Sequence, residues 1–530
     1  MVDEGFVLEQ IAKFALNPAT SRSDANKRYI KNEIVRSHNF FDTIESNPLT
    51  ETQRHAVVVD EDNNLVVAAA GSGKTSVIVA KVGHLIHRQF QQPKNILVLA
   101  YGKDAQSELQ ERIKKSLGKL IADQVTIKTF HALGLAVIGD VKGRRPSIAK
   151  VAEGARSLSK LIDDIIQQLL SNERFATPMR NWFQSYFAPY QSPFDFQNLG
   201  EHRDYIRRHQ IDTLKGDTVK SFEECEIANF LFLNGIDYKY ENYYVHDTAN
   251  KKYAQYRPDF FLTAHGVYIE HFAVSRDGRT PAFIEQDYLE KMNWKRELHK
   301  NYNTPLVETY SYEKREGTLL TNLEAKLSSR GIKLQPIEPA AMYPVLTNSG
   351  RIDPFTRLTA TFLGHWKSNR LSVEQARQRA QQLRDPARAL AYLEVFSMIF
   401  AEYQLRLGSN GEIDFNDMII EATDHVEASR YQNPYSYICV DEFQDISRSR
   451  ARLLKALLQQ SPSNQLFAVG DDWQAIYRFA GSDISVMQQF QKHFGISETT
   501  ILGETFRCVD GGGVSSRARP SKPDPRLKPG

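Results

Sequence analysis

The stretch that decides the fold is Leu65-Val66-Val67-Ala68-Ala69-Ala70-Gly71-Ser72-Gly73-Lys74-Thr75. Its apolar start predicts a buried strand, and a helix-like run from Ser76 to Arg88 follows. Small residues are needed in between, because backbone N–H groups can close on phosphate oxygens only where no bulky side chain holds them off. The start of a helix adds partial positive charge at the same place. The pattern therefore predicts a phosphate-binding loop.

The chemistry of this loop predicts a nucleotide as its ligand. Lys74 can reach the β- and γ-phosphates, and the Thr75 hydroxyl can hold Mg²⁺. We expect ATP and Mg²⁺ to be bound by Ala68, Ala69, Ala70, Gly71, Ser72, Gly73, Lys74 and Thr75. Ala68 stands where such loops usually begin with glycine, and a glycine-rich turn with a chance Lys-Thr pair is the alternative. The loop therefore predicts that a nucleotide is bound, but it does not predict the function of the protein.

A glutamine precedes the loop in the segment Pro48 to Arg54. Thr50 is placed to cap the helix that carries Gln53. The Gln53 amide has both a donor and an acceptor, as reading an adenine edge requires. We therefore expect Gln53 to take part in nucleotide binding.

Length and composition bound the class of protein. A chain of 530 residues is too long for one core, so we expect about three or four domains. The composition is that of a soluble globular protein, and a net charge of only +3 limits any nucleic-acid surface to a local patch. Three scattered cysteines fit a reducing cytoplasm. Neither a leader pattern nor a run of about 18 apolar residues is present, so we expect no membrane contact.

Two further strands follow the loop and end in residues suited to DNA. The run from Ile96 to Ala100 predicts a strand, and Tyr101 at its end offers a ring on which a base can stack. The run from Val125 to His131 predicts a third strand, which ends in Thr-Phe-His. We expect Tyr101, Phe130 and His131 to contact DNA. An ordinary connecting loop at Tyr101 and a structural role for His131 are the alternatives.

A second block of motifs lies far along the chain. An apolar strand from Tyr437 to Val440 delivers two adjacent carboxylates, Asp441 and Glu442, to its end. Asp441 can hold Mg²⁺ and Glu442 can polarise the attacking water, which is the division of labour that phosphoanhydride hydrolysis requires. Because Lys74 and Asp441 must meet at one Mg²⁺, the residues between the two blocks are predicted to be an insertion.

The most specific block follows the next strand, Gln465 to Val469. Gln474 is placed to sense the γ-phosphate, and Tyr477 and Phe479 offer aromatic faces to bases. The glutamine motif, the P-loop, the strand-end motifs, the Asp-Glu pair and this block resemble the UvrD/Rep-type helicases of superfamily 1, in that family's order. The wording from Asp471 to Phe479 resembles the helicase IV branch more than UvrD itself.

This resemblance implies an ATP-dependent DNA helicase that translocates 3′ to 5′. Its partner would be single-stranded or partly duplex DNA, in repair or recombination, and the resemblance does not identify a protein partner. Thr505-Phe506-Arg507 resembles the motif whose arginine reaches the γ-phosphate, so Arg507 would support hydrolysis. After Phe479 this chain has Ala480-Gly481, where many relatives have Arg-Gly. The contact that the relatives' arginine makes is therefore in doubt for this chain.

The family pattern breaks off between the two blocks, where another set of carboxylates lies. Glu224 falls on a predicted helix, and Asp259 and Glu270 fall on two strands of a predicted hairpin. The following helix carries Lys291 and Lys295. Carboxylates that bind Mg²⁺ and a lysine that orients water are what metal-dependent phosphodiester cleavage needs. The set resembles the PD-(D/E)xK nuclease-like fold, with Lys291 or Lys295 standing in for the motif's strand lysine. A helicase side domain with a satisfied Asp-Glu pair is the alternative.

We therefore expect an α/β fold: a RecA-like P-loop domain with a helical side domain and an inserted α/β nuclease-like domain. The expected ranges are an N-terminal helical region (1–47), the RecA-like domain in two parts (48–140 and 411–503), the helical side domain in two parts (141–218 and 336–410), the nuclease-like insertion (219–335), and the start of a second motor domain with a disordered tail (504–530). Because only one motor domain is expected, this chain should bind ATP·Mg²⁺ but hydrolyse it slowly and not unwind DNA alone.

Two other functions stay open from the sequence. One is a Mg²⁺-dependent DNA nuclease, or a DNA-binding protein for which the P-loop is a switch. The other is an inactive remnant of a truncated helicase, because the Pro- and Gly-rich residues 510–530 lack apolar periodicity.

Overall fold

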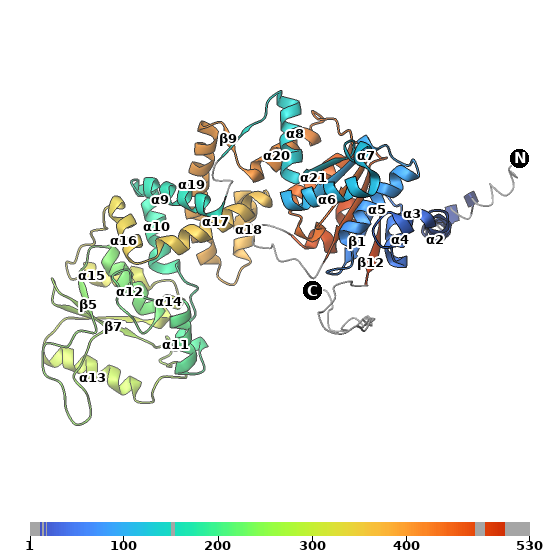
Figure 1. Ribbon diagram of the computed structural model, residues 1–530. Coiled ribbons are helices and arrows are strands. Elements are labelled where there is room, and N and C mark those ends of the chain that lie inside the picture. Colours follow the sequence, from blue (N-terminus) through green and yellow to red (C-terminus); the bar gives the residue numbers. More distant parts are fainter. Residues whose placement is uncertain (1–10, 13–14, 17, 150–153, 472–482, 504–530) are drawn as a thin grey trace, which may run out of the picture. The chain divides into compact units, whose positions relative to one another are not determined.

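The computed structural model describes residues 11–12, 15–16, 18–149, 154–471 and 483–503. The chain forms two compact units, whose elements are labelled in Figure 1. Unit 1 comprises residues 1–152, 361–370 and 407–530, and unit 2 comprises residues 153–360 and 371–406. Among the described residues, no helix is both long enough and apolar enough to cross a membrane. The finer domain ranges given above stay predictions.

Unit 1 is built around a six-stranded sheet in which all neighbouring strands run parallel. The strand order is β12-β1-β11-β10-β2-β3. In chain order these strands are β1 (Asn63–Ala68), β2 (Ile96–Ala100), β3 (Thr126–Thr129), β10 (Tyr437–Val440), β11 (Gln465–Gly470) and β12 (Ser497–Leu502). The strands of the second motif block thus insert between β1 and β2, which confirms the predicted α/β architecture of this part.

Helices cover both faces of the sheet, which is why its strands are continuous apolar runs. Successive residues of β2 alternate between two cores: Ile96 and Val98 pack in one, and Leu97 and Leu99 in the other. The first core contains residues of α4 (Glu51–Val58), α5 (Lys74–His87) and α6 (Lys103–Leu117). The second contains residues of α8 (Phe130–Lys142), α20 (Phe415–Glu427) and α21 (Arg448–Gln459).

Smaller elements complete unit 1. They are α2 (Pro18–Arg36), α3 (His38–Thr43), η1 (Pro93–Asn95), α7 (Lys119–Ala122), η6 (Phe443–Asp445), α22 (Ser485–Gln488), α23 (Phe490–Phe494), and the parallel pair β4 (Ser147–Ile148) and β9 (Glu412–Ile413). The β4–β9 pair joins residues from the two ends of the long middle segment. The first part of unit 1 and its return are therefore in contact beside the insertion as well as in the sheet.

The third strand ends earlier than the sequence predicts. Strand β3 stops at Thr129, whose Oγ1 accepts a hydrogen bond from the backbone N of Ala132 at 3.1 Å. This is a helix N-cap, so Phe130 and His131 begin α8 instead of ending a strand. The expectation of a strand through His131 was therefore wrong for its last two residues.

A buried ion cluster fixes the segment that returns to unit 1. Lys367 lies near the end of α17 (Ile352–Ser368), and its side chain is only 2% exposed. Its ammonium pairs with Asp414 at 2.5 Å and with Asp417 at 2.6 Å. Burial and the neighbouring Asp414 raise the pKa of Asp417. Because Asp414 also caps α20, the lysine holds the start of that helix in place.

Unit 2 contains a four-stranded sheet in the order β5-β6-β7-β8. Its strands are β5 (Tyr238–Tyr240), β6 (Phe260–Leu262), β7 (Val267–Phe272) and β8 (Leu306–Tyr310). The first three run antiparallel, which confirms the predicted hairpin, and β8 runs parallel to β7. Helix α12 (Phe222–Leu233) precedes the sheet, and α13 (Tyr288–Asn301) makes the crossover that a parallel pair requires.

The remaining helices of unit 2 surround this sheet or form its helical part. They are α9 (Ala155–Leu169), α10 (Glu173–Asn181), η3 (Trp182–Tyr186), η4 (Pro193–Asp195), α11 (Leu199–Arg208), α14 (Ser311–Arg315), α15 (Leu319–Ser328), η5 (Pro339–Ala341), α16 (Met342–Asn348), α18 (Val373–Gln381) and α19 (Pro386–Ser409), of which α19 also reaches unit 1. One core joins α12 and α15 to the sheet through Leu231, Phe260, Ile269 and Leu323, all fully buried.

Candidate functional site

The predicted nucleotide site lies at the carboxyl ends of three neighbouring strands of unit 1. The phosphate loop follows β1, Asp441 and Glu442 follow β10, and Asp471 follows β11. Because β11 pairs with both β1 and β10, these ends meet at one edge of the sheet. Ligands of parallel α/β sheets bind at this edge.

The loop is held by Gln53. Its Nε2 donates to the carbonyl oxygen of Ser72 at 2.9 Å, and its Oε1 accepts from the backbone N of Thr50 at 3.0 Å. Gly73 has φ +88°, and a Cβ there would lie 2.5 Å from Gln53 Nε2. Both ends of the Gln53 amide therefore hold backbone, and the contacts indicate that it positions the loop. The predicted contact to adenine stays a prediction.

The start of α5 supplies the donors that a phosphate needs. Gly73 is its N-cap and Lys74 its first residue, so the N–H groups of this first turn have no partner within the helix. The Ser72 hydroxyl is buried and has no hydrogen-bond partner. Gly71 also has a positive φ, of 77°, so the loop bends sharply around these donors. The cradle thus fits the phosphates of a nucleotide.

A chain of polar contacts connects the loop to the two neighbouring strands. Lys74 Nζ lies 2.7 Å from Glu442 Oε2, although the two residues are 368 positions apart. Gln444 Nε2 donates to the same oxygen at 2.7 Å, and Gln444 Oε1 accepts from the backbone N of Asp471 at 2.8 Å. Gln444 was not predicted from the sequence. Its place two residues after the Asp-Glu pair is the only signal that marked it.

Asp441 lies in a buried and electronegative position. Burial and the adjacent Glu442 raise the pKa of Asp441 to about 6. The same two causes raise the pKa of Asp445 to about 6. A cation placed here would favour the ionised carboxylates.

The donor set near the loop fits Mg²⁺ in one particular way. Within the described residues, no three His, Cys, Asp or Glu side chains form a group that could hold a metal. Mg²⁺ in phosphate sites usually takes only one or two protein ligands and completes its shell with water and phosphate oxygens. Thr75 and Asp441, the two predicted ligands, are sufficient for such a site.

Three residues predicted to contact DNA lie on the second core side of the sheet. Tyr101 is half-buried, and the Arg450 guanidinium lies 4.9 Å from its ring centroid. Phe130 is only 4% exposed and packs in the core, so in this conformation its ring offers no face to a base, contrary to expectation. His131 packs on Phe415 with ring centroids 4.7 Å apart, and burial and the nearby Arg450 lower its pKa to about 4. Neutral His131 therefore fits the structural alternative.

Four predicted residues lie outside the part of the chain that the structure describes. They are Gln474, Tyr477, Phe479 and Arg507. Their predicted roles at the γ-phosphate and on DNA stay predictions, as does the tail from 504 onward. Asp471, which Gln444 contacts, directly precedes the segment that contains three of them.

The carboxylates predicted in unit 2 also come together. Asp259 raises the pKa of both Glu224 and Glu270 by its charge, after burial as the larger cause, to about 7 and about 8. Lys295 Nζ lies 2.5 Å from Glu270 Oε2. Lys291 instead pairs with Glu285 and Asp287 on the surface, so the expectation that Lys291 serves this cluster was wrong. Lys295, one helical turn further on, has that place.

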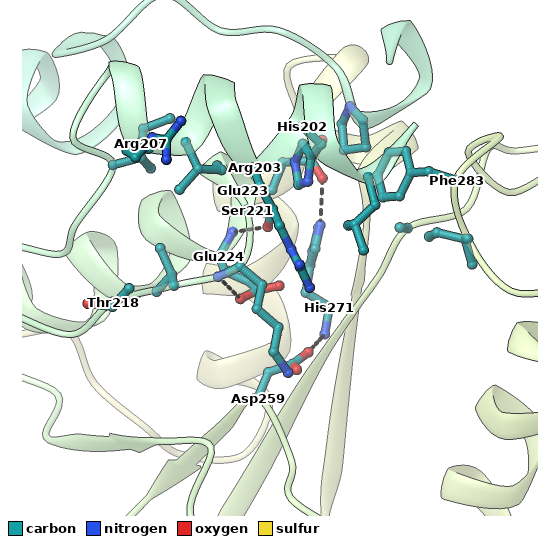
Figure 2. Close-up of a pocket in the computed structure, with 18 of the residues that line it drawn as sticks. His202, Arg203, Arg207, Thr218, Ser221, Glu223, Glu224, Asp259, His271 and Phe283 are labelled. Carbon is teal, nitrogen blue, oxygen red and sulfur yellow. Dashed lines mark hydrogen bonds and ion pairs between the residues drawn. The ribbon is translucent and has the colours of Figure 1, made fainter. Parts of the chain in front are cut away.

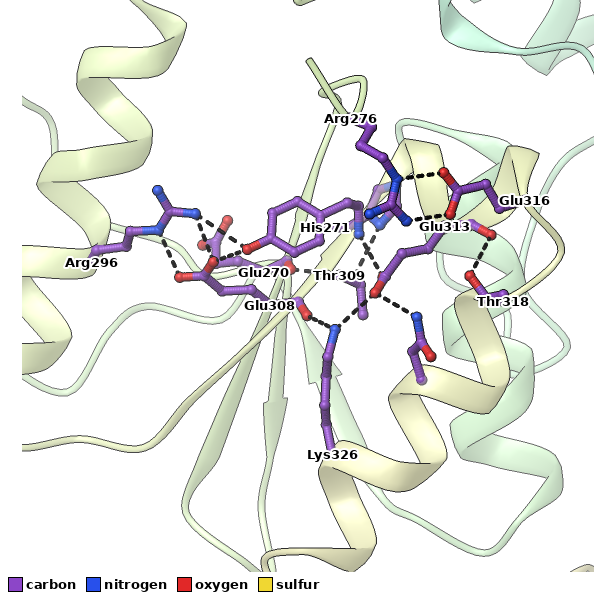
Figure 3. A network of polar contacts seen from close by, with 12 residues as sticks. Glu270, His271, Arg276, Arg296, Glu308, Thr309, Glu313, Glu316, Thr318 and Lys326 are labelled. Atoms are coloured by element: carbon purple, nitrogen blue, oxygen red, sulfur yellow. Dashed lines mark hydrogen bonds and ion pairs between the residues drawn. The ribbon is translucent and has the colours of Figure 1, made fainter. Parts of the chain in front are cut away.

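The helix that carries Lys295 is anchored by its neighbour. Arg296 makes a two-pronged contact with Glu308 of β8, with N–O distances of 2.8 and 2.7 Å (Figure 3). Such paired hydrogen bonds fix orientation as well as distance. Elsewhere in the same network, Lys326 of α15 pairs with Glu313 of α14 at 3.0 Å. Helix α13 is thus fixed to β8, and Lys295 is directed at Glu270.

Each carboxylate of this cluster already accepts hydrogen bonds from protein donors. Asp259 Oδ2 accepts from the backbone N of His271 at 2.6 Å, as Figure 2 shows. Tyr240 OH donates to Glu224, and Tyr256 OH donates to Glu270, both at 2.5 Å. The cluster is therefore a satisfied network in this conformation.

The fold and the loop define a P-loop nucleotide-binding domain. The chain belongs to the UvrD/REP helicase family, because the model of that family's N-terminal domain matches residues 49–495. This confirms the family that the order of motifs predicts.

Several curated relatives are similar to parts of this chain. DNA helicase IV of Escherichia coli (strain K12) is 26% identical over 494 residues, which cover 92% of this chain and 49% of that protein. ATP-dependent DNA helicase PcrA of Bacillus subtilis (strain 168) is 36% identical over 123 residues, or 22% of this chain and 16% of the relative. ATP-dependent DNA helicase Rep of Salmonella typhimurium is 37% identical over 125 residues, or 24% and 17%. This chain spans about half the length of helicase IV and less of the others.

Proposed function

We propose that this chain is the ATP-binding part of an ATP-dependent DNA helicase of the UvrD/Rep type. It would couple ATP hydrolysis to 3′–5′ translocation on single-stranded DNA. The single observation that carries the proposal is the contact chain Lys74–Glu442–Gln444–Asp471, because it joins a phosphate cradle to the start of the segment predicted to contact DNA. The printed names of the relatives, which are ATP-dependent DNA helicases, support it.

The roles of the site residues follow from their positions. The first turn of α5 and Lys74 bind the phosphates, and Thr75 with Asp441 would hold Mg²⁺. When bound, Mg²⁺ supplies positive charge that stabilises the phosphates during transfer. Glu442 is the base that orients the attacking water. A phosphate group would compete with Glu442 for the Lys74 ammonium, so nucleotide binding is expected to release Glu442 toward the water.

Gln444 is the residue that links hydrolysis to DNA. Its amide bridges Glu442 and the backbone of Asp471, with both distances below 3 Å. A shift of Glu442 on nucleotide binding would therefore be passed through Gln444 to Asp471, the residue directly before segment 472–482. That segment contains Gln474, Tyr477 and Phe479, which are proposed to sense the γ-phosphate and to stack bases.

ATP turnover with and without oligo-dT tests this proposal. Replacing Gln444 with Ala should leave ATP affinity within about twofold and abolish any stimulation by DNA of the slow turnover that is expected of this chain. Gln460 is a matched control, because its Nε2 also bridges to backbone, at Tyr431, but away from the site. DNA stimulation that survives in Gln444→Ala would refute the coupling role. Lack of both ATP binding and DNA binding in the wild-type chain would refute the helicase assignment itself.

We further propose that the sheet part of unit 2 is a nuclease-like insertion. The order α12-β5-β6-β7-α13-β8 places Glu224, Asp259, Glu270 and Lys295 near one another, as that fold would require. The match to the predicted hairpin and crossover helix supports the fold. Metal-dependent cleavage by this insertion is a separate question, and the satisfied network of its carboxylates does not favour it.

A further inference from the structure

We propose that a cavity in unit 2 binds a single strand of DNA and holds it without cutting it. The proposal rests on the proposed function in one respect, namely that DNA is the polymer on which the protein acts. The cavity has a volume of about 710 Å³ and is lined by α11, the start of α12, the β6–β7 region and α13. Figure 2 shows its labelled side chains, with Arg203 and Arg207 of α11 and Asp259 beside β6.

The cations of the cavity wall favour a phosphate ligand. The lining contains four acidic side chains, Asp212, Glu223, Glu224 and Asp259, and four basic ones, Arg203, Arg207, Lys220 and Lys295. Three of them have acidic partners, since Arg207 pairs with Asp204, Lys220 with Glu241 and Lys295 with Glu270. Across the described part of the chain, the Arg203 guanidinium has no ion pair or side-chain hydrogen bond. Arg203 is therefore the group best placed to receive a phosphate, which a guanidinium can grip with two parallel bonds.

The dimensions of the cavity favour one strand over a duplex. A volume of about 710 Å³ lies in the range of small-ligand pockets, roughly 300–1,000 Å³. A cavity of this volume cannot enclose a duplex, whose major groove alone is about 12 Å wide and about 8.5 Å deep. The wall also carries an aromatic ring, Phe283, which stacks on His202 with centroids 5.0 Å apart. An aromatic wall beside a cation is what unstacked bases and their phosphates require.

The acidic side of the cavity is compatible with a phosphate. On that side Tyr240 OH donates to Glu224 and the backbone N of His271 donates to Asp259, so both carboxylates already accept hydrogen bonds from the protein. The Lys295 ammonium adds positive charge at the same side.

The same contacts explain why the strand is held and not cut. Lys295 and Tyr256 occupy Glu270, Tyr240 occupies Glu224, and the His271 backbone occupies Asp259. A cation that bound through Glu270 would have to displace Tyr256 or Lys295, because each oxygen of that carboxylate already accepts from one of them. Binding of a strand needs no such change.

Photo-cross-linking of the full chain tests the proposal. The probe is a fluorescent single-stranded oligonucleotide of about 12 nucleotides carrying 5-iododeoxyuridine, within the usual site sizes of roughly 4–16. Cross-linked peptides are mapped by mass spectrometry, and the yield is titrated against salt. We expect a cross-link at Phe283 or at Tyr288, a second aromatic residue of the cavity wall. Arg203→Ala should lower its yield at least threefold and reduce the slope of log affinity against log salt by about 0.7, the value for one lost phosphate contact.

Control variants separate this site from the motor. Arg208→Ala removes a charge from the same helix outside the cavity and should change nothing. Lys74→Ala should also leave the Phe283 cross-link unchanged. Cross-links confined to unit 1 would overturn the inference and leave the proposed function standing, whereas no DNA binding anywhere would remove both. Mg²⁺-dependent cleavage of the probe that is lost in Asp259→Asn would refute holding without cutting.

Discussion

The replacement of Gln53 by Ala tests whether this residue positions the loop or reads the base. The variant loses two hydrogen bonds of a 6% exposed side chain, at 2.9 Å to the Ser72 carbonyl and at 3.0 Å from the Thr50 N–H. Each such bond contributes roughly 0.5–1.5 kcal/mol, so the free energy of unfolding should fall by about 2 kcal/mol. Because the loop loses its support, nucleotide affinity should fall about tenfold, or 1.4 kcal/mol.

The assay is the binding of fluorescent ATP and GTP analogues together with urea unfolding. Gln106→Ala is the matched control, since Gln106 Nε2 donates to the Ile127 carbonyl at 2.8 Å away from the loop. It should cost about 1 kcal/mol of stability and leave nucleotide affinity unchanged. If Gln53 positions the loop, the variant weakens ATP and GTP equally. A selective loss of ATP affinity would refute this reasoning and establish contact with adenine.

Two further predictions concern buried charges. Lys367→Met leaves Asp414 and Asp417 without their cation, so the free energy of unfolding should fall by roughly 3–5 kcal/mol in a urea titration. Lys115→Met replaces an exposed lysine and is the control, and its free energy of unfolding should stay within about 0.5 kcal/mol of the wild-type value. Glu270 has a folded-state pKa of about 8, raised by burial and by Asp259, so the folded state keeps a proton that the unfolded chain releases. Stability should therefore fall as pH rises between the ordinary glutamate pKa and pH 8, by up to about 1.4 kcal/mol per unit, and Glu270→Gln should flatten this slope; an unchanged slope would contradict the assignment.

The sequence allowed the motor sheet to be predicted because its signals are local and repeated. Buried parallel strands are continuous apolar runs, and each motif sits at the end of one of them, so β1, β2, β10 and β11 were identified from the residues alone. That the loop of Lys74 and the Asp441-Glu442 pair lie at one site was expected from the Mg²⁺ that the two motifs share, whereas the direct contact of Lys74 with Glu442 is a finding of the structure. By contrast, β3 ends at Thr129 because this residue caps α8, and the strand was predicted to continue through Phe130 and His131 because the cap was not recognised.

What the sequence left open depends on tertiary contacts. Lys291 and Lys295 lie one turn apart on the same helix, and only the position of Glu270 decides between them. Gln53 contacts the backbone carbonyl of Ser72, and the position of that carbonyl follows from the folded loop and not from the residue types in the motif. Arg203 lies on α11, in a segment without motifs, and its role follows only from the cavity that it lines.

Calorimetric binding of Mg²⁺·ATP to the wild-type chain, Lys74→Ala and Glu442→Gln tests the nucleotide site most directly. In the structure Glu442 competes for Lys74 at 2.7 Å and adds negative charge beside the phosphates. We therefore expect one ATP per wild-type chain, at least tenfold weaker binding by Lys74→Ala, and binding by Glu442→Gln that is as tight as wild type or tighter but without hydrolysis. Equal affinity of Lys74→Ala and the wild-type chain, or weaker binding by Glu442→Gln, would contradict a site built on this pair.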